Sequence, residues 1–262
     1  MLSKLKSIFQ PTTLEEAAAL LQQPGVYPLY GGGAALIRSN SPAIEAGVNL
    51  TALIGAGCGG DKKGLWIDGC ATLDTFAAYD PGFIGPVIHD DMPETLRNAL
   101  TLGDVLMEVN PDSLTLAVLV GLRAQIKSRA GQSVDIDAWF NLTADERRQY
   151  IVTGVFLPEY RPGMWQIVLE KVSRTPSDAP IVAAIGFARG GGRSTSVVTF
   201  FVVVCGVSDR PVRYKPRDIA SLTSEIDDYR GSAEYRTEMA KIVCSRAIMR
   251  AVEASQKAAA EA

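Results

Sequence analysis

Three consecutive glycines, Gly31 to Gly33, separate two apolar runs in the stretch PLYGGGAALIR at 28–38. Glycine is the residue used where the backbone takes a positive φ or where another group approaches it closely. A strand followed by a glycine-rich loop and a helix can hold a phosphate group on its backbone N–H groups. The triplet therefore predicts either a tight turn or a phosphate-binding loop.

The common nucleotide fingerprints are not met at this loop. A P-loop ends in Gly-Lys-Ser/Thr, and no lysine follows Gly33. The pattern G-x-G-x-x-G fits at Gly31 and Gly33 but has Leu36 at its third glycine. The segment SNSP at 39–42 also ends the following run too early for a doubly wound fold. Spacing alone leaves both the turn and the phosphate site open.

Length and charge exclude several classes of protein. The 262 residues suffice for one large domain or two moderate ones. A net charge of −3 gives no basic footprint, so we expect no nucleic-acid partner. The longest apolar stretch, 197–207, is shorter than the about 20 residues of a membrane-spanning helix, and the N-terminus lacks a signal-peptide core. We expect a soluble, cytoplasmic protein without a transmembrane segment.

The residues that usually bind metals or carry acid–base catalysis are sparse. No two of the four cysteines have C-x-x-C spacing, and His89 is the single histidine. We therefore predict no metal site and no catalytic residue on this chain. The segment VIHDDMPE places His89 beside two aspartates, where we expect a solvated turn. The cysteines are expected to be buried thiols; they are Cys58, Cys70, Cys205 and Cys244.

Capping signals and periodicity predict an α+β protein. A helix over 11–25 is expected to begin at Thr13, with Glu16 completing a capping box and Pro24-Gly25 ending it. In the rest of the N-terminal part we expect strands at 26–30, 65–69, 134–140 and 149–158, and a strand and turn at 46–53. We also expect a hairpin connection at 55–64 and a helix at 72–79. The segment 93–129 is expected to start as a helix, cross a Gly-Asp turn at 103–104 and continue as helix and then strand.

The sequence changes character after YRPG at 160–163, a candidate domain boundary. Long apolar runs at 164–174, 180–189 and 193–207 predict strands or strand-and-helix segments, and the glycines at 190–192 predict the turn of an antiparallel hairpin. The segment 232–262 is predicted to be helical. Its larger apolar residues recur mostly every three or four positions; they are Tyr235, Met239, Ile242, Val243, Met249 and Val252.

Six motifs, taken in order, resemble one known family. They are FQPTTLEEA (9–17), PLYGGGAAL (28–36), IDGCATLDTF (67–76), RNALTLGDVL (97–106), EKVSRTPSDAPIV (170–182) and DYRGSAEYRTEMA (228–240). Each resembles the corresponding motif of the medium, FAD-binding subunit of molybdenum hydroxylases, the group of carbon monoxide and xanthine dehydrogenases. The resemblance extends over nearly the whole chain.

The resemblance implies a fold and a role. The fold would be an FAD-binding domain of the PCMH, or vanillyl-alcohol-oxidase-like, type over 1–163, with subdomains of about 1–54 and 55–163. A smaller α+β domain with an antiparallel sheet and a C-terminal helix would follow over 164–262. FAD would pass electrons from a [2Fe–2S] small subunit to an acceptor. A molybdopterin-binding large subunit would carry the substrate chemistry, in a heterohexamer.

The resemblance also implies which residues would bind FAD. The first diphosphate loop would comprise Leu29, Gly31, Gly32, Gly33, Ala34 and Ala35. Thr101, Gly103 and Asp104 would form the second loop, and Lys171 would flank the flavin.

The sequence departs from the family pattern in both loops. Gly33 and Ala34 replace the usual Thr and Asp, whereas Asp104 and Val105 replace a Gly and an Asn. A buried aspartate aimed at a diphosphate would repel it. Two hypotheses therefore remain: a working flavin subunit, with Asp104 pointing away, or a flavin-free structural subunit of such a complex.

Overall fold

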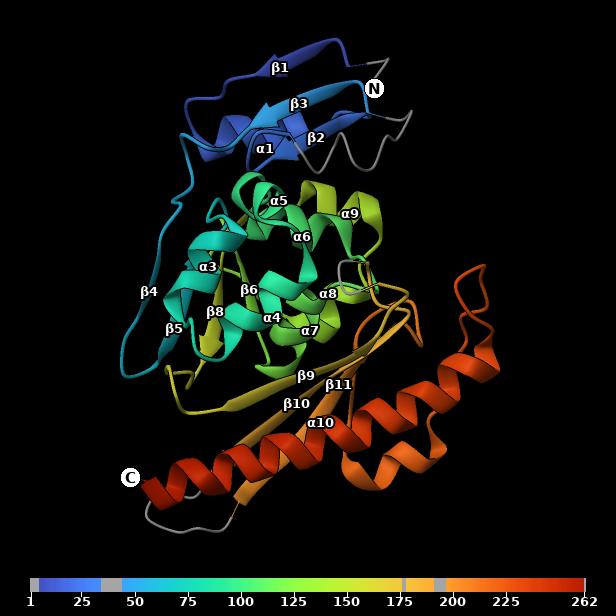
Figure 1. Cartoon of the computed structure of the whole chain (residues 1–262). Helices are drawn as coiled ribbons and strands as arrows, with labels where there is room; N and C mark the ends of the chain where they lie inside the picture. Colours follow the sequence, from blue (N-terminus) through green and yellow to red (C-terminus); the bar gives the residue numbers. More distant parts are fainter. Residues whose placement is uncertain (1–4, 34–43, 176–177, 191–196, 262) are drawn as a thin grey trace. The chain divides into compact units, whose positions relative to one another are not determined.

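The computed structural model in Figure 1 describes residues 5–33, 44–175, 178–190 and 197–261. The chain forms two compact units. Unit 1 comprises Met1–Tyr79, Pro93–Val109 and Arg123–Glu159, and unit 2 comprises Asp80–Met92, Asn110–Leu122 and Tyr160–Ala262. Both units are therefore discontinuous in sequence. The expected domain boundaries near residues 54 and 163 stay predictions.

Unit 1 begins with a small parallel sheet. Its strands β1 (Ser7–Phe9), β2 (Val26–Leu29) and β3 (Ala46–Asn49) lie in the order β1-β3-β2. Helix α1 (Leu14–Leu21) connects β1 to β2. The Thr13 hydroxyl caps this helix as predicted, accepting from the N–H of Glu16 at 3.1 Å. The reciprocal bond differs, because the Glu16 carboxylate accepts from the N–H of Thr12 at 2.7 Å.

The second sheet of unit 1 is antiparallel and has the order β4-β5-β8-β6-β7. The predicted connection at 55–64 forms the hairpin of its first two strands. The strands are β4 (Cys58–Gly60), β5 (Gly64–Asp68), β6 (Gln125–Ser128), β7 (Ser133–Asp135) and β8 (Val152–Pro158). Besides α1, the helices in the described part of this unit are α3 (Leu73–Tyr79), α5 (Glu94–Ala99), α6 (Leu102–Glu108), α8 (Ile136–Phe140) and α9 (Ala144–Gln149).

Unit 2 is built on an antiparallel sheet of order β12-β11-β10-β9. Its elements are α4 (Ile84–Asp91), α7 (Leu114–Gly121), β9 (Gln166–Val172), β10 (Val182–Gly190), β11 (Val197–Cys205), β12 (Val212–Tyr214), a 3₁₀ helix at Pro216–Ser221 and α10 (Ala233–Glu261). Side chains alternate between the two faces of a strand. On β10, Gly186 faces α10, where an added Cβ would lie 2.3 Å from the carbonyl oxygen of Ala247. The next residue, Phe187, faces α7, because a Cβ at Gly121 would lie 2.2 Å from its ring.

Helix α10, drawn in red in Figure 1, runs across this sheet. The structure buries mainly small residues on its inner face, which are Ala240, Val243, Cys244, Ala247 and Ala251. Of the large apolar residues in the predicted pattern, Tyr235, Ile242 and Met249 are exposed. Small side chains let the helix approach the backbone of Gly186 closely, so the inner face of α10 holds Val243 of the predicted pattern together with smaller residues.

The predicted α+β class is confirmed, with antiparallel sheets and a long C-terminal helix, and three local predictions are wrong. His89 lies in the last turn of α4 rather than in a turn, although it is exposed. Gly103 and Asp104 lie inside helix α6, because Thr101 caps a new helix there. The stretch 134–140 is strand only to Asp135 and then becomes α8. No helix in the described ranges is both long enough and apolar enough to cross a membrane.

Candidate functional site

The first glycine loop follows β2 in unit 1. Leu29, its first candidate, ends the strand with a buried side chain that packs with Ile44. Gly32 is exposed, and a Cβ added there or at Gly33 would meet nothing within 4 Å. Gly33 has a φ of 79°, which favours glycine. The backbone of this loop is thus open to an approaching group. Ala34 and Ala35 lie outside the described residues.

The second loop is the beginning of helix α6. Thr101 is its N-cap and forms a capping box with Asp104. Oδ2 of Asp104 accepts from the Thr101 N–H at 3.0 Å and from the Thr101 hydroxyl at 2.9 Å. The Thr101 hydroxyl oxygen accepts in turn from the Asp104 N–H at 3.3 Å. Both residues are only 3% exposed. The local sequence TLGD therefore starts a helix by itself.

Every backbone N–H from residue 101 to residue 105 already has an acceptor within the chain. The N–H groups of Thr101 and Asp104 are used by the capping box. Leu102 donates to the carbonyl of Ala71 and Gly103 donates to that of Gly69, both at 2.9 Å. Val105 donates to the carbonyl of Thr101 at 3.2 Å. The second loop consequently has no spare N–H group for a ligand in this conformation.

The two loops, seventy residues apart in sequence, meet in unit 1. A Cβ on Gly31 would lie 3.0 Å from Cγ2 of Thr101 and 3.2 Å from Oδ2 of Asp104. The residue before Gly31 makes a second contact between the two segments. A Cβ on Gly103 would lie 2.3 Å from the ring of Tyr30. Gly31 therefore lies beside Thr101 and Asp104 in the structure, and the role of these residues in binding a cofactor stays a prediction.

Tyr30 fixes the first loop to the antiparallel sheet of unit 1. Its side chain is fully buried, and its hydroxyl accepts from the N–H of Val152 at 2.8 Å and donates to the carbonyl of Tyr150 at 3.4 Å. Burial raises the pKa of this phenol, so that it stays protonated. The sequence motifs assign no role to Tyr30. The available signal was an aromatic residue directly before the glycine triplet.

Burial is also the main influence on the Asp104 carboxyl group, and it raises the pKa of Asp104. The hydrogen bonds from Thr101 lower the pKa, and the nearby charge of Glu108 raises it. The backbone N–H of Tyr30 lies close enough to lower it as well. The Asp104 carboxylate therefore lies between the N–H groups of Thr101 and Tyr30, and its burial disfavours the charged form.

The two loops differ in how well they fit a diphosphate. The first presents open glycine backbone, which suits close approach of an anion. The second has only engaged donors and holds a carboxylate against the first. The first loop fits the diphosphate of FAD, and the second does not fit it as it stands.

Lys171 lies in unit 2, on β9. Its Nζ forms an ion pair with Oδ2 of Asp90 at 2.9 Å, and its side chain is 15% exposed. This contact fixes the lysine to α4. Its expected position beside a flavin stays a prediction.

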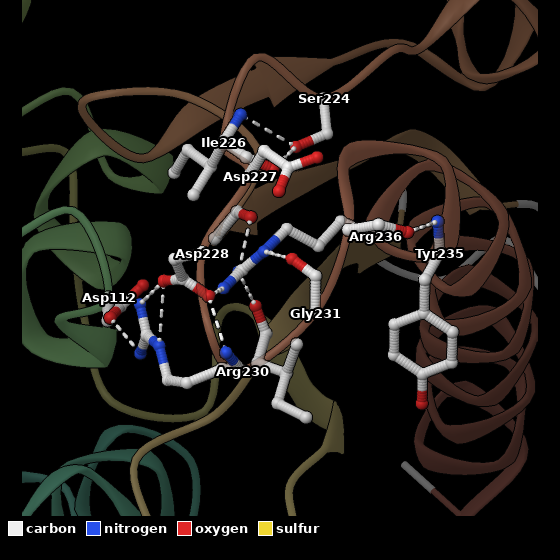
Figure 2. Close-up of polar contacts among 12 residues, drawn as sticks. Asp112, Ser224, Ile226, Asp227, Asp228, Arg230, Gly231, Tyr235 and Arg236 are labelled. Carbon is white, nitrogen blue, oxygen red and sulfur yellow. Dashed lines mark hydrogen bonds and ion pairs between the residues drawn. The ribbon is translucent and has the colours of Figure 1, made fainter.

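The C-terminal motif DYRGSAEYR forms a polar network in unit 2 (Figure 2). The fully buried guanidinium of Arg236 donates to Oδ1 of Asp228 at 2.6 Å and to the carbonyls of Gly206 and Gly231 at 2.9 and 3.2 Å, as well as to that of Ile181. Arg230 forms ion pairs with both Asp228, at 3.0 Å, and Asp112, at 2.6 Å. Asp112 lies just before α7. The motif therefore organises the fold of unit 2.

No protein-family model matches the sequence, and no curated protein matches it. Solved structures do match in three dimensions. A chain of reconstituted CO dehydrogenase from Oligotropha carboxidovorans has a TM-score of 0.79 and 21% identity, with 97% of this chain and 99% of that chain covered. A chain of CO dehydrogenase from Hydrogenophaga pseudoflava has a TM-score of 0.80 and 17% identity, with 97% of this chain and 99% of that chain covered. That enzyme is in a form that lacks the Mo-pyranopterin moiety of the molybdenum cofactor.

Quinoline 2-oxidoreductase from Pseudomonas putida 86 gives a TM-score of 0.76 and 19% identity, with 98% of this chain and 99% of that chain covered. All three matches extend over nearly the full length of both chains. This protein therefore shares the fold of chains from CO dehydrogenase and quinoline 2-oxidoreductase, which confirms at the level of the fold the resemblance that its motifs carry.

Proposed function

We propose that this chain is the flavoprotein-type subunit of a molybdenum-containing hydroxylase or dehydrogenase complex, with unit 1 as its FAD-binding part of the PCMH type. The observation that carries the proposal is the meeting of Gly31 with Thr101 and Asp104 in a fold shared with CO dehydrogenase. The partners would be a small [2Fe–2S] subunit and a large molybdopterin-binding subunit in a cytoplasmic heterohexamer.

Bound FAD would supply the electron transfer between the iron–sulfur partner and the final acceptor. The role of this chain would be to bind and orient it. Gly32 and Gly33 offer open backbone for its diphosphate. No acid–base step is assigned to any side chain of this protein.

A visible absorption spectrum tests the flavin. The chain is purified, incubated with FAD and passed through a desalting column. The two visible bands of oxidised flavin, in stoichiometric amount, support the proposal. A colourless chain, both alone and after co-purification with its partners, contradicts flavin binding.

A second candidate function, a flavin-free structural subunit, is favoured by one observation. Every N–H group from Thr101 to Val105 is engaged within the chain. Affinity purification from the native cells separates the two candidates. A complex that contains iron, molybdenum and this chain but no flavin supports the structural subunit. A complex that contains flavin supports the electron-transfer subunit, whereas purification without any such partner contradicts both.

A further inference from the structure

Asp104 lies where the family motif has a glycine, and its carboxylate occupies the junction of the two glycine loops. Oδ2 accepts from the N–H and the hydroxyl of Thr101 at 3.0 and 2.9 Å. On the other side, the same oxygen would lie 3.2 Å from a Cβ on Gly31. A carboxylate and a phosphate group bind the same donors, backbone N–H and hydroxyl groups. Asp104 therefore fills the hydrogen-bonding role of an anion between the loops.

We propose that the Asp104 carboxylate is a built-in anion of this site, so that FAD reaches the donors of the second loop only when the carboxylate is displaced or uncharged. This inference rests on the proposed function and specifies how that same site is controlled. Its consequence is weak, exchangeable FAD binding rather than the permanent binding of a cofactor.

The surrounding backbone gives FAD no alternative set of donors in the second loop. Leu102 and Gly103 donate to the carbonyls of Ala71 and Gly69. These bonds hold the start of α6 against the segment between β5 and α3, so that releasing them disrupts the local fold. The N–H and hydroxyl of Thr101 are the donors that a movement of one side chain would free.

The charge of Asp104 opposes binding of a diphosphate, as its position does. The Asp104 side chain is buried, and a diphosphate carries negative charge at neutral pH. Two like charges in a poorly solvated site repel each other more strongly than in water. Removal of the Asp104 charge should therefore strengthen binding of diphosphate ligands and leave binding of an uncharged flavin unchanged.

The experiment compares the full-length wild-type chain with Asp104→Asn, which keeps the size of the side chain and one oxygen that can accept from Thr101. Asp104→Ser is a second neutral variant. Dissociation constants are measured by calorimetry for FAD, for ADP as a diphosphate probe, and for riboflavin, which has no phosphate. Thermal unfolding verifies that each variant folds. We expect at least tenfold tighter binding of FAD and ADP by Asp104→Asn, with riboflavin affinity unchanged.

Helix α9 offers a matched control. Glu146 forms the same kind of capping box there, accepting from the N–H and hydroxyl of Thr143 at 2.7 and 2.8 Å, but it is exposed to solvent. Glu146→Gln removes an acidic cap and one negative charge as well, yet no glycine loop faces it in the described contacts. Its FAD dissociation constant should stay within twofold of the wild-type value.

The outcomes separate this inference from the proposed function. If the wild type binds FAD and neither Asp104 variant binds it more tightly, the inference is overturned and the proposed function stands. An equal gain in riboflavin affinity also overturns the inference, because the effect would not act on the diphosphate. If neither the wild type nor any folded variant binds FAD or ADP, both are overturned.

Discussion

The ring of Tyr30 lies so close to the backbone of Gly103 that a Cβ at residue 103 would come within 2.3 Å of its Cγ. Tyr30 directly precedes the first glycine loop, and Gly103 lies in the second. A buried aromatic ring and a glycine in helix α6 therefore hold the two loops together. This contact explains why a helix accepts glycine at a position where alanine would otherwise be favoured.

Substitution of Gly103 by alanine should destabilise the protein. The fully buried ring of Tyr30 has little room to move, and overpacking of a core costs about 1–3 kcal/mol. Urea denaturation of Gly103→Ala measures the loss of unfolding free energy. Gly32→Ala is the matched control, because an added Cβ there meets nothing within 4 Å, and we expect a change within about 0.5 kcal/mol. Equal effects of the two substitutions would contradict this packing argument.

Removal of the Arg236 guanidinium should be among the most damaging single changes in unit 2. The side chain is fully buried, and Arg236→Met removes one donor from the Asp228 carboxylate, which keeps its bonds from Arg230, and one from each of three backbone carbonyls. Loss of one partner of a buried ion pair costs about 3–5 kcal/mol. Chemical denaturation provides the measurement.

Arg217→Met is the control for that change. Its side chain is 78% exposed and pairs with Asp218 at 3.5 Å, so we expect a loss of about 1 kcal/mol or less. A stability change in Arg236→Met no larger than in this control would show that the network in Figure 2 is not stabilising.

Acid should weaken unit 2 through Asp228. Partial burial alone would raise the pKa of Asp228, but hydrogen bonds from Arg236 and Arg230 outweigh it and hold the pKa below its usual range. A lowered pKa contributes stability above the unfolded-state pKa of about 3.9, and this contribution is lost as the pH falls below that value. Unfolding free energies measured from pH 6 downward should therefore decrease less steeply below pH ~4 for Asp228→Asn than for the wild type. Parallel curves would contradict this assignment.

Acid should weaken the fold through Asp228, but it should strengthen binding of the FAD diphosphate through Asp104. Burial raises the pKa of Asp104, so the carboxyl group becomes protonated as the pH falls toward the ordinary aspartate value of about 3.9, and at a higher pH than an exposed aspartate would. The titratable groups that act on it are Glu108 on the same helix, the Tyr30 phenol and the Cys70 thiol. The last two carry raised pKa values and stay neutral in this range.

We therefore expect the wild type to bind ADP more tightly as the pH is lowered from neutrality toward the ordinary aspartate range, measured by calorimetry. The gain should be larger in the wild type than in Asp104→Asn, which corrects for protonation of the ligand and of Glu108. An equal pH dependence in both proteins would show that Asp104 does not titrate against the ligand.

Local signals in the sequence predicted much of the fold correctly. Thr13 begins α1 as its capping pattern predicts, and the apolar runs after residue 163 form the antiparallel strands of unit 2. The order of six motifs indicated the fold that the CO dehydrogenase chains share. Caps and strand periodicity depend on neighbours within a few residues, which is why the sequence reveals them.

The turn expected at Gly103-Asp104 was wrong although the deciding signal is local, because the capping box of Thr101 and Asp104 starts a helix there. Contacts between distant segments decide other features. The close approach of Gly186 to Ala247 buries mainly small residues of α10, whereas Tyr235, Ile242 and Met249 of the apolar pattern are exposed.

The sequence by itself determined that a glycine triplet and a second segment with one glycine, Gly103, exist, and that Asp104 stands where the resembling motif has a further glycine. Only the tertiary structure decided where that carboxylate points and which N–H groups remain open. The donors of Leu102 and Gly103 are used by carbonyls about thirty residues earlier, and the Asp104 oxygen lies against Gly31 from a strand end still farther away. Hydrogen-bond partners are set by distances in space, and no local pattern in the sequence specifies which distant carbonyl will satisfy a given donor.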